Sequence, residues 1–413
     1  MSGAKGISGC EREFSARSEF LARSPTSLPI EDWSARSGQT IPSLDGVRAC
    51  SVSIVLVGHL ILPSSLIGFS ALGLDIFYLV SGFLITRLFF AEAKDTGSLN
   101  LRTFYLRRII RLYPVLLVYL MLVLTIQVAR GASINRLEVS SVLFYFWNYL
   151  VAHNEFIGIW SNIPIGQLWS LSVEEHFYLF APIAFVFVRG SASNTIKIAL
   201  SICIGSLLLR YLYTSMWPGI EKTLWIYRHS ETRGDSIAYG MLLACLAQSE
   251  AHRHIIRLLA GRRAFVISAV ALFCTYAIRD EYFRNTLLFS LRSLTLIPLL
   301  CGVVFGEPFP IVNSLLNQPI VKWVGQISYS LYVWQFAAIF FFSWCLFRLP
   351  LPLDLALQLV LTFVFACCSF YLIERPSMQL RKFVTVASRA VADSPQSSLT
   401  RTRADIFAAL PGA

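Results

Sequence analysis

A histidine and an arginine occur together in the first strongly apolar stretch of the chain, 47–63. Arg48 precedes His59 by eleven residues. On one helix both side chains would point to the same side, roughly 16 Å apart along the axis. An ionisable group inside a membrane span costs about 2.5–3.5 kcal/mol on insertion scales and usually serves a function. The pair indicates an elongated anionic ligand brought to a reaction centre. The alternative is a histidine satisfied by a helix–helix hydrogen bond.

A second basic group precedes the third apolar window, where Arg107, Arg108 and Arg111 fall within 105–114. Arg108 and Arg111 are three residues apart and therefore share a helix face. Paired guanidinium groups of fixed geometry suit the binding of phosphates. Anchoring of the membrane topology needs positive charge as well, and the spacing does not decide between the two interpretations.

Asp75 places a carboxylate near the outer end of the second apolar window, 72–91. It could orient an imidazole, as a carboxylate does in hydrolytic triads. It could equally cap a helix or pair with an arginine, and the sequence leaves all three open. Further along this window, Ser81 and Gly82 would let a neighbouring helix approach closely.

The segment 169–178 carries two carboxylates and an imidazole beside each other. Ser172 and Glu175 have the S-x-x-E spacing of a capping box, which predicts the start of a helix there. That interpretation leaves Glu174 and His176 without a structural role. Such a cluster at a membrane boundary could transfer protons or bind a sugar.

Charges of alternating sign occupy the segment 228–235, on the outer side before the sixth window. A solvated loop is the common reason for such a pattern. Arg233 and Asp235 abut the predicted membrane and are therefore candidate substrate-binding residues. Trp169 is a third candidate for that role.

The composition is that of a polytopic membrane protein. Of 413 residues, 55% are hydrophobic and 14% charged, with a mean hydropathy of +0.61; soluble domains have about 25% charged residues. The net charge of +11 lies mainly in tails and loops, which indicates membrane topology and not nucleic-acid binding. The nine cysteines show no metal-ligand spacing with histidine, so we expect no metal site.

Hydropathy predicts an all-α fold, a polytopic membrane helix bundle of about ten transmembrane helices with both termini cytoplasmic. The ten apolar windows are about 47–63, 72–91, 112–129, 176–189, 195–214, 235–248, 264–279, 287–305, 326–347 and 352–373. The aromatic segment 139–152 suits an interfacial or re-entrant helix. We expect three parts, a disordered cytoplasmic tail (1–42), the transmembrane domain (43–380) and a second disordered cytoplasmic tail (381–413).

Six short motifs in order through 43–380 resemble acyltransferase family 3, the integral-membrane O-acyltransferases that modify surface glycans and some small molecules. They are Ser43-Leu-Asp-Gly-Val-Arg48 with His59, Ser81-Gly-Phe-Leu-Ile-Thr86, Arg108/Arg111, Trp169-Ser-Leu-Ser-Val-Glu-Glu175, Thr232-Arg-Gly-Asp235 and Ile327-Ser-Tyr-Ser-Leu-Tyr332. Each alone is weak, and the six in order are specific.

The resemblance implies that Arg48 and His59 form the family's Arg-x10-His motif, with His59 as the essential catalytic residue. It also implies that Arg108 and Arg111 help bind cytoplasmic acyl-CoA, and we expect Arg48 to bind it as well. Asp75, Glu174 and Glu175 are further catalytic candidates, for orienting the imidazole or relaying protons. One departure is Gln335, where members commonly have a histidine; a glutamine forms hydrogen bonds but does not titrate. Some members also carry a C-terminal hydrolase-like domain. With 374–413 after the last window, we expect this membrane domain to complete the reaction or hand on to a separate protein.

The sequence therefore predicts an acyl-CoA-dependent O-acyltransferase of the bacterial inner membrane. We expect it to move an acetyl group from acetyl-CoA to a hydroxyl of a polysaccharide, such as lipopolysaccharide or exopolysaccharide, or of a lipid-linked saccharide. A proton-coupled exporter of a glycan or lipid, using the same ionisable residues, is the alternative. An inactive family member serving as a binding scaffold is a third.

Overall fold

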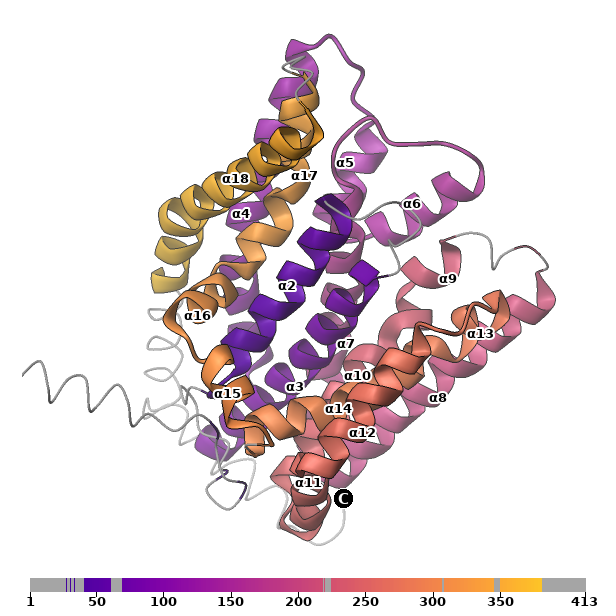
Figure 1. Ribbon diagram of the computed structural model, residues 1–413, viewed down its shortest axis with the longest axis vertical. Coiled ribbons are helices and arrows are strands. Elements are labelled where there is room, and N and C mark those ends of the chain that lie inside the picture. Colours follow the sequence, from indigo (N-terminus) through magenta and orange to yellow (C-terminus); the bar gives the residue numbers. More distant parts are fainter. Residues whose placement is uncertain are drawn as a thin grey trace, which may run out of the picture.

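The computed structural model describes residues 27, 30, 33, 41–60, 69–217, 219, 224–306, 308–344 and 350–380. Within these residues the chain forms helices and no strands, as the hydropathy predicts. Most of the predicted tail 1–42 and all of the tail 381–413 lie outside the described residues. Figure 1 shows the helices gathered into one elongated bundle.

One helix overlaps each of the ten apolar windows. These helices are α2 (Leu44–Leu60), α3 (Ser70–Thr96), α4 (Leu101–Ala129), α7 (Trp169–Phe187), α8 (Ala192–Met216), α10 (Ser230–Gln248), α12 (Arg262–Thr275), α14 (Leu288–Phe305), α17 (Ser328–Trp344) and α18 (Leu351–Ser369). The helix α2, which carries Arg48 and His59, packs against α3, α16 and α17.

Five helical segments of the described chain are long and apolar enough to cross a membrane: Ser70–Thr96, Leu101–Ala129, Ala192–Met216, Leu288–Phe305 and Pro352–Leu380. A sixth is possible if Glu250–Ala260 and Arg262–Thr275, which are bent by 65°, form one broken span. Within the described residues, α2 and α17 each have 17 residues, fewer than the ~20 of a straight span. The protein is a multi-pass membrane protein, and the count of ten spans and the position of the termini stay predictions.

Shorter elements connect the long helices. They are α5 (Arg136–Leu143), α6 (Trp147–Phe156), α9 (Trp225–Arg228), α11 (Arg253–Ala260), α13 (Glu281–Thr286), α15 (Pro310–Leu316), α16 (Pro319–Gln326), the 3-10 turns Gly166–Leu168 and Glu250–His252, and the π-helical turn Phe370–Glu374. The aromatic segment 139–152 is divided between α5 and α6, with Tyr145 between them in the left-handed region at φ 59°. Neither piece is long enough for a span.

The helices α3 and α10 approach each other closely at two glycines. A Cβ atom on Gly82 would lie 1.9 Å from the backbone oxygen of Ile237, and one on Gly240 would lie 2.0 Å from that of Leu79. A hydrogen is the largest substituent that this separation accepts. The expected close approach at Gly82 is therefore confirmed, and it brings the Asp75-bearing helix against α10.

We expect Gly82→Ala to lower the free energy of unfolding by about 1–3 kcal/mol, because the added methyl forces the two backbones apart. Thermal unfolding of the detergent-solubilised protein measures the change. The matched control is Gly205→Ala in α8, where a Cβ atom meets nothing within 4 Å. An alanine there should be neutral or stabilising by up to about 1 kcal/mol. Equal midpoints for the two variants would contradict the close packing.

Two residues of the predicted N-terminal tail are buried in the helix bundle. Ile30 is 3% exposed and Trp33 is 5% exposed. The indole of Trp33 packs on the rings of Phe83 and Phe305, with centroids 5.8 Å and 4.9 Å away. It also faces the guanidinium of Arg87 at 5.1 Å. The Ser- and Arg-rich composition of the tail did not indicate this anchor.

Candidate active site

Arg48 and His59 lie near opposite ends of α2, as their spacing predicts, and both are paired with residues of α17. Arg48 donates from Nη2 to Oγ of Ser328 at 3.0 Å. Nδ1 of His59 lies 3.0 Å from Oε1 of Gln335. Because the pairs Arg48–Ser328 and His59–Gln335 follow the same order along both helices, α2 and α17 run side by side in the same direction. The two helices together hold the histidine.

The His59 side chain is half-buried between an amide and an aromatic ring. Its ring centroid lies 5.2 Å from that of Phe336, at an interplanar angle of 49°. Gln335 is fully buried, and its Nε2 donates to the backbone oxygen of Tyr332 at 3.1 Å. The side-chain amide of Gln335 is thus the hydrogen-bond partner of Nδ1 of His59.

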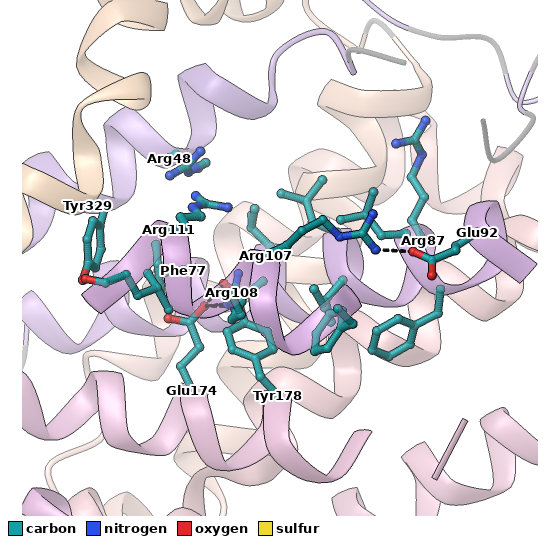
Figure 2. A pocket seen from close by; sticks show the side chains of 18 of the residues that line it. Arg48, Phe77, Arg87, Glu92, Arg107, Arg108, Arg111, Glu174, Tyr178 and Tyr329 are labelled. Atoms are coloured by element: carbon teal, nitrogen blue, oxygen red, sulfur yellow. Dashed lines mark hydrogen bonds and ion pairs between the residues drawn. The ribbon is translucent and has the colours of Figure 1, made fainter. Parts of the chain in front are cut away.

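A cavity of about 430 Å³ opens beside Arg48 and is lined by residues of α2, α3, α4, α7 and α17. Figure 2 shows its side chains. Its charged lining residues are Arg48, Arg87, Arg107, Arg108, Arg111, Glu92 and Glu174. Five arginines against two glutamates leave the cavity wall strongly positive. A concave, low-dielectric site of one sign concentrates ligands of the opposite charge.

Arg108 is already neutralised by the two glutamates of α7. Its Nη2 lies 3.6 Å from Oε1 of Glu174 and its Nε lies 3.6 Å from Oε1 of Glu175. The guanidinium also stacks on Tyr178, 3.3 Å from the ring centroid. Ser81 donates to Glu174 at 2.5 Å and Tyr178 donates to the same oxygen. Arg108 is therefore held in place as part of the cavity wall.

Arg111 differs from Arg108 in having no carboxylate partner. The buried Nε atoms of both arginines lack a hydrogen-bond partner, but no ion pair in the described part of the chain includes Arg111. Its guanidinium lies next to that of Arg48 at one end of the cavity (Figure 2). The nearest carboxylate partner of Arg48 is Asp45, at 4.0 Å and 42% exposed. Two neighbouring cations thus line the cavity, and the buried carboxylate of Glu374 interacts electrostatically with both of them.

The predicted capping box at Ser172 and Glu175 is wrong. The helix α7 begins at Trp169, directly after the 3-10 turn Gly166–Leu168, so both residues lie within the helix. Ser172 is 1% exposed. Because the preceding turn continues into the helix, α7 needs no side-chain cap at this point, and the carboxylate of Glu175 is left for Arg108.

A second and much smaller space is lined by residues of α2 that lie between Arg48 and His59 in the sequence. Its volume is about 20 Å³, room for about one water molecule. Val52 and Val55 of α2 line it together with Phe77 and Tyr332. Val55 lies one helical turn before His59, and Phe77 also lines the arginine cavity. The space therefore lies beside the part of α2 between Arg48 and His59, and His59 itself does not line it.

Asp75 lies apart from His59 and is held by two arginines. It is fully buried, and its Oδ1 accepts from Nη2 of Arg233 at 2.5 Å. Its Oδ2 lies 3.7 Å from Nη1 of Arg292. Among the described residues no contact joins Asp75 to the imidazole. Of the three roles that the sequence leaves open, pairing with arginine is the one observed.

Arg233 and Asp235 lie inside α10 and are both 0% exposed, so the solvated-loop interpretation is wrong. Asp235 is paired with Arg210 of α8 at 2.7 Å and accepts from Ser290 at 2.7 Å. Arg210 also donates to the backbone oxygens of Thr232 and Thr286. These contacts bind α8, α10, α13 and α14 together. They form a buried polar network, and neither Arg233 nor Asp235 lines the two cavities described here.

Sequence reasoning missed two buried arginines, Arg210, which pairs with Asp235, and Arg292, which pairs with Asp75. Both fall within predicted apolar windows, 195–214 and 287–305. A charge inside a span is itself the signal that could have found them, because it needs a partner of opposite charge. Tyr178 and Ser328, which contact the cavity arginines, carry no such signal.

Trp169 and His176 lie on α7 next to the segment before α10. The ring of Trp169 contacts that of Tyr227, with centroids 4.8 Å apart. Nδ1 of His176 lies 2.7 Å from Oγ of Ser230, and the imidazole stacks on Tyr149 of α6. Burial, with the carboxylate of Glu231 adding to it, raises the pKa of Tyr149 to about 12. The phenol of Tyr149 therefore keeps its proton and remains a hydrogen-bond donor. His176 does not line the arginine cavity.

Comparison with known proteins identifies a family and several relatives. An acyltransferase-domain family matches residues 41–375. A Staphylococcus aureus (strain COL) protein named "Putative O-acetyltransferase" is 30% identical over 358 residues, 81% of this chain and 57% of that protein. The peptidoglycan O-acetyltransferase OatA of Listeria monocytogenes is 28% identical over 360 residues, 82% of this chain and 56% of that protein. The chain thus spans little more than half the length of these relatives. No solved structure matches it.

Proposed function

The chain belongs to acyltransferase family 3, and on that premise we propose that it is a membrane O-acetyltransferase. It takes the acetyl group of cytoplasmic acetyl-CoA and transfers it to a hydroxyl of a surface glycan or lipid-linked saccharide. The observation that carries the proposal is the placement of an arginine-lined cavity and His59 along one helix, α2.

The donor end of the proposal rests on Arg48 and Arg111. Coenzyme A carries a diphosphate and a further phosphate, and guanidinium groups bind phosphate oxygens by charge-assisted hydrogen bonds. Arg111 lines the cavity and forms no ion pair among the described residues. Arg108 supports the site differently, since Glu174 and Glu175 fix it beside the ligand.

The pantetheine arm then runs from the arginines along α2. Arg48 and His59 are eleven residues apart, which is roughly 16 Å along a helix axis. An extended pantetheine arm spans a distance of this order. The small space lined by Val55 and Phe77 lies beside this part of α2. Its volume of about 20 Å³ is too small for the pantetheine arm. Binding of the donor therefore has to widen it.

His59 performs the chemistry at the far end. As a general base it takes the proton of the acceptor hydroxyl while the oxygen attacks the thioester carbonyl carbon. The carbon–sulfur bond breaks, and the leaving thiolate of CoA receives the proton from the imidazolium. As a transient carrier, the imidazole nitrogen attacks the thioester carbonyl carbon, the carbon–sulfur bond breaks and CoA leaves as its thiolate. The acceptor oxygen then attacks the acetyl carbon, the carbon–nitrogen bond breaks, and the hydroxyl proton passes to the CoA thiolate. Both routes yield an acetyl ester and free CoA.

The acceptor and the location are proposed from the relatives. Peptidoglycan is the acceptor in the name of the Listeria protein, and an O-acetyltransferase is the name of the Staphylococcus one. A glycan hydroxyl reached from the bacterial inner membrane fits both. The exporter alternative requires a proton path through His59, Asp75 and Glu174. No observation favours it, since arginines hold both carboxylates.

We expect Arg111→Ala to weaken acetyl-CoA binding by roughly 10- to 150-fold, the loss of one charged hydrogen-bonding partner. Isothermal titration of the purified protein in lipid nanodiscs measures it. The matched control is Arg102→Ala, an exposed arginine on the same helix that does not line the cavity. Wild-type affinity of Arg111→Ala for acetyl-CoA would show that acetyl-CoA does not bind in this cavity.

A further inference from the structure

The amide of Gln335 is held in one orientation by the helix that carries it. Its nitrogen lies 3.1 Å from the backbone oxygen of Tyr332, and its oxygen lies 3.0 Å from Nδ1 of His59. A backbone carbonyl accepts hydrogen bonds and never donates them. The amide nitrogen must therefore face Tyr332, because a flipped amide would set two carbonyl oxygens against each other. The amide oxygen is left facing the imidazole.

An amide oxygen is likewise an acceptor without a proton to give. Nδ1 of His59 consequently carries the hydrogen of this contact. In a neutral imidazole the other nitrogen, Nε2, then has the lone pair. We infer that Gln335 is a positioning residue that holds His59 in the Nδ1–H tautomer and makes Nε2 the reacting atom. This inference rests on the proposed function for its catalytic meaning and on the geometry alone for the tautomer.

A glutamine at this position, where the family resemblance implies a histidine, then has a mechanistic consequence. A histidine partner can present either a lone pair or an N–H, so it leaves the tautomer of its neighbour open. A tethered amide oxygen removes that freedom. It also carries no charge, so it orients the imidazole without the strong stabilisation of the imidazolium that a carboxylate gives. When Nε2 takes up the acceptor proton, Nδ1–H keeps its hydrogen bond to Gln335.

The tautomer is directly measurable by ¹⁵N NMR of the full-length protein in lipid nanodiscs, labelled at histidine nitrogens. The chain has six histidines, and the resonances absent from His59→Gln assign those of His59. At a pH where the ring is neutral, the expected spectrum has a protonated Nδ1 and an unprotonated Nε2. A protonated Nε2 in the wild type would overturn the inference. The NMR measurement needs no turnover, so its result is independent of the acetyltransferase proposal.

Kinetics test the catalytic meaning through two substitutions of the same residue. Gln335→Ala frees the ring, so kcat falls about tenfold or more while the KM for acetyl-CoA stays unchanged. Gln335→Glu places a negative charge beside the ring, which favours the imidazolium. The acid limb of the pH–rate profile then moves upward by about one pH unit or more.

Gln127 offers a matched control, because it is also a buried glutamine whose amide donates to a backbone oxygen, that of Asn162. Gln127→Glu should leave the acid limb unmoved. An unmoved limb in Gln335→Glu, together with wild-type kcat in Gln335→Ala, would refute the positioning role. If the wild type itself transfers no acetyl group, the proposed function fails and the NMR result alone decides the tautomer.

Discussion

We expect His59→Ala to lower acetyl transfer by about 10²- to 10⁴-fold, the usual contribution of a general acid–base residue. The cause is the loss of the imidazole that accepts the hydroxyl proton or carries the acetyl group. The measurement is mass spectrometry of envelope glycans and lipids from cells lacking the protein, complemented with wild type or variant at equal expression. An acetyl mass that wild type restores and His59→Ala does not restore supports transfer through His59.

Binding and a matched histidine separate chemistry from folding in this comparison. Acetyl-CoA affinity should be retained in His59→Ala, because the phosphates bind at the other end of α2. His254→Ala is the control, an exposed histidine of α11 that contacts a backbone oxygen of its own segment. It should restore acetylation fully. Full restoration by His59→Ala would instead show that the catalytic assignment is wrong.

The second large effect is expected at Asp75. Replacing it with asparagine leaves Arg233 and Arg292 without their buried carboxylate, and breaking such a buried pair typically costs about 3–5 kcal/mol of stability. Denaturant or thermal unfolding of the solubilised protein reports the loss. The control is Glu250→Gln, whose partner Arg253 lies 3.3 Å away and whose own side chain is 82% exposed. A surface pair of this kind contributes at most about 1 kcal/mol.

A double replacement tests whether the loss comes from the unpaired charge. Adding Arg233→Met to Asp75→Leu should recover part of the stability that Asp75→Leu loses, because one of the two orphaned cations is removed. An Asp75→Asn protein that is as stable as the wild type but inactive would contradict a purely structural role for this carboxylate. It would return Asp75 to the catalytic role that the sequence left open.

The sequence determined the helices and the placement of residues along each one. Hydropathy located all ten long helices because burial in lipid or protein requires continuous apolar surface. The spacing of Arg48 and His59 put them on one helix, since helical geometry is local. The short aromatic segment 139–152 was likewise separated correctly from the long helices. The six motifs identified the family, and the match over 41–375 confirms it.

The tertiary structure decided which of these residues meet. His59 and Gln335 are 276 residues apart in sequence, and Asp75 and Arg233 are 158 apart. Local spacing carries no information on such pairs, because helix packing brings them together. For the same reason Arg108 and Arg111 look equivalent in the sequence, yet the glutamates of α7 neutralise Arg108 and leave Arg111 facing the cavity. The sequence determined which ionisable groups the apolar helices carry. The packing of those helices decided which of these groups form ion pairs with each other and which stay available to bind a ligand.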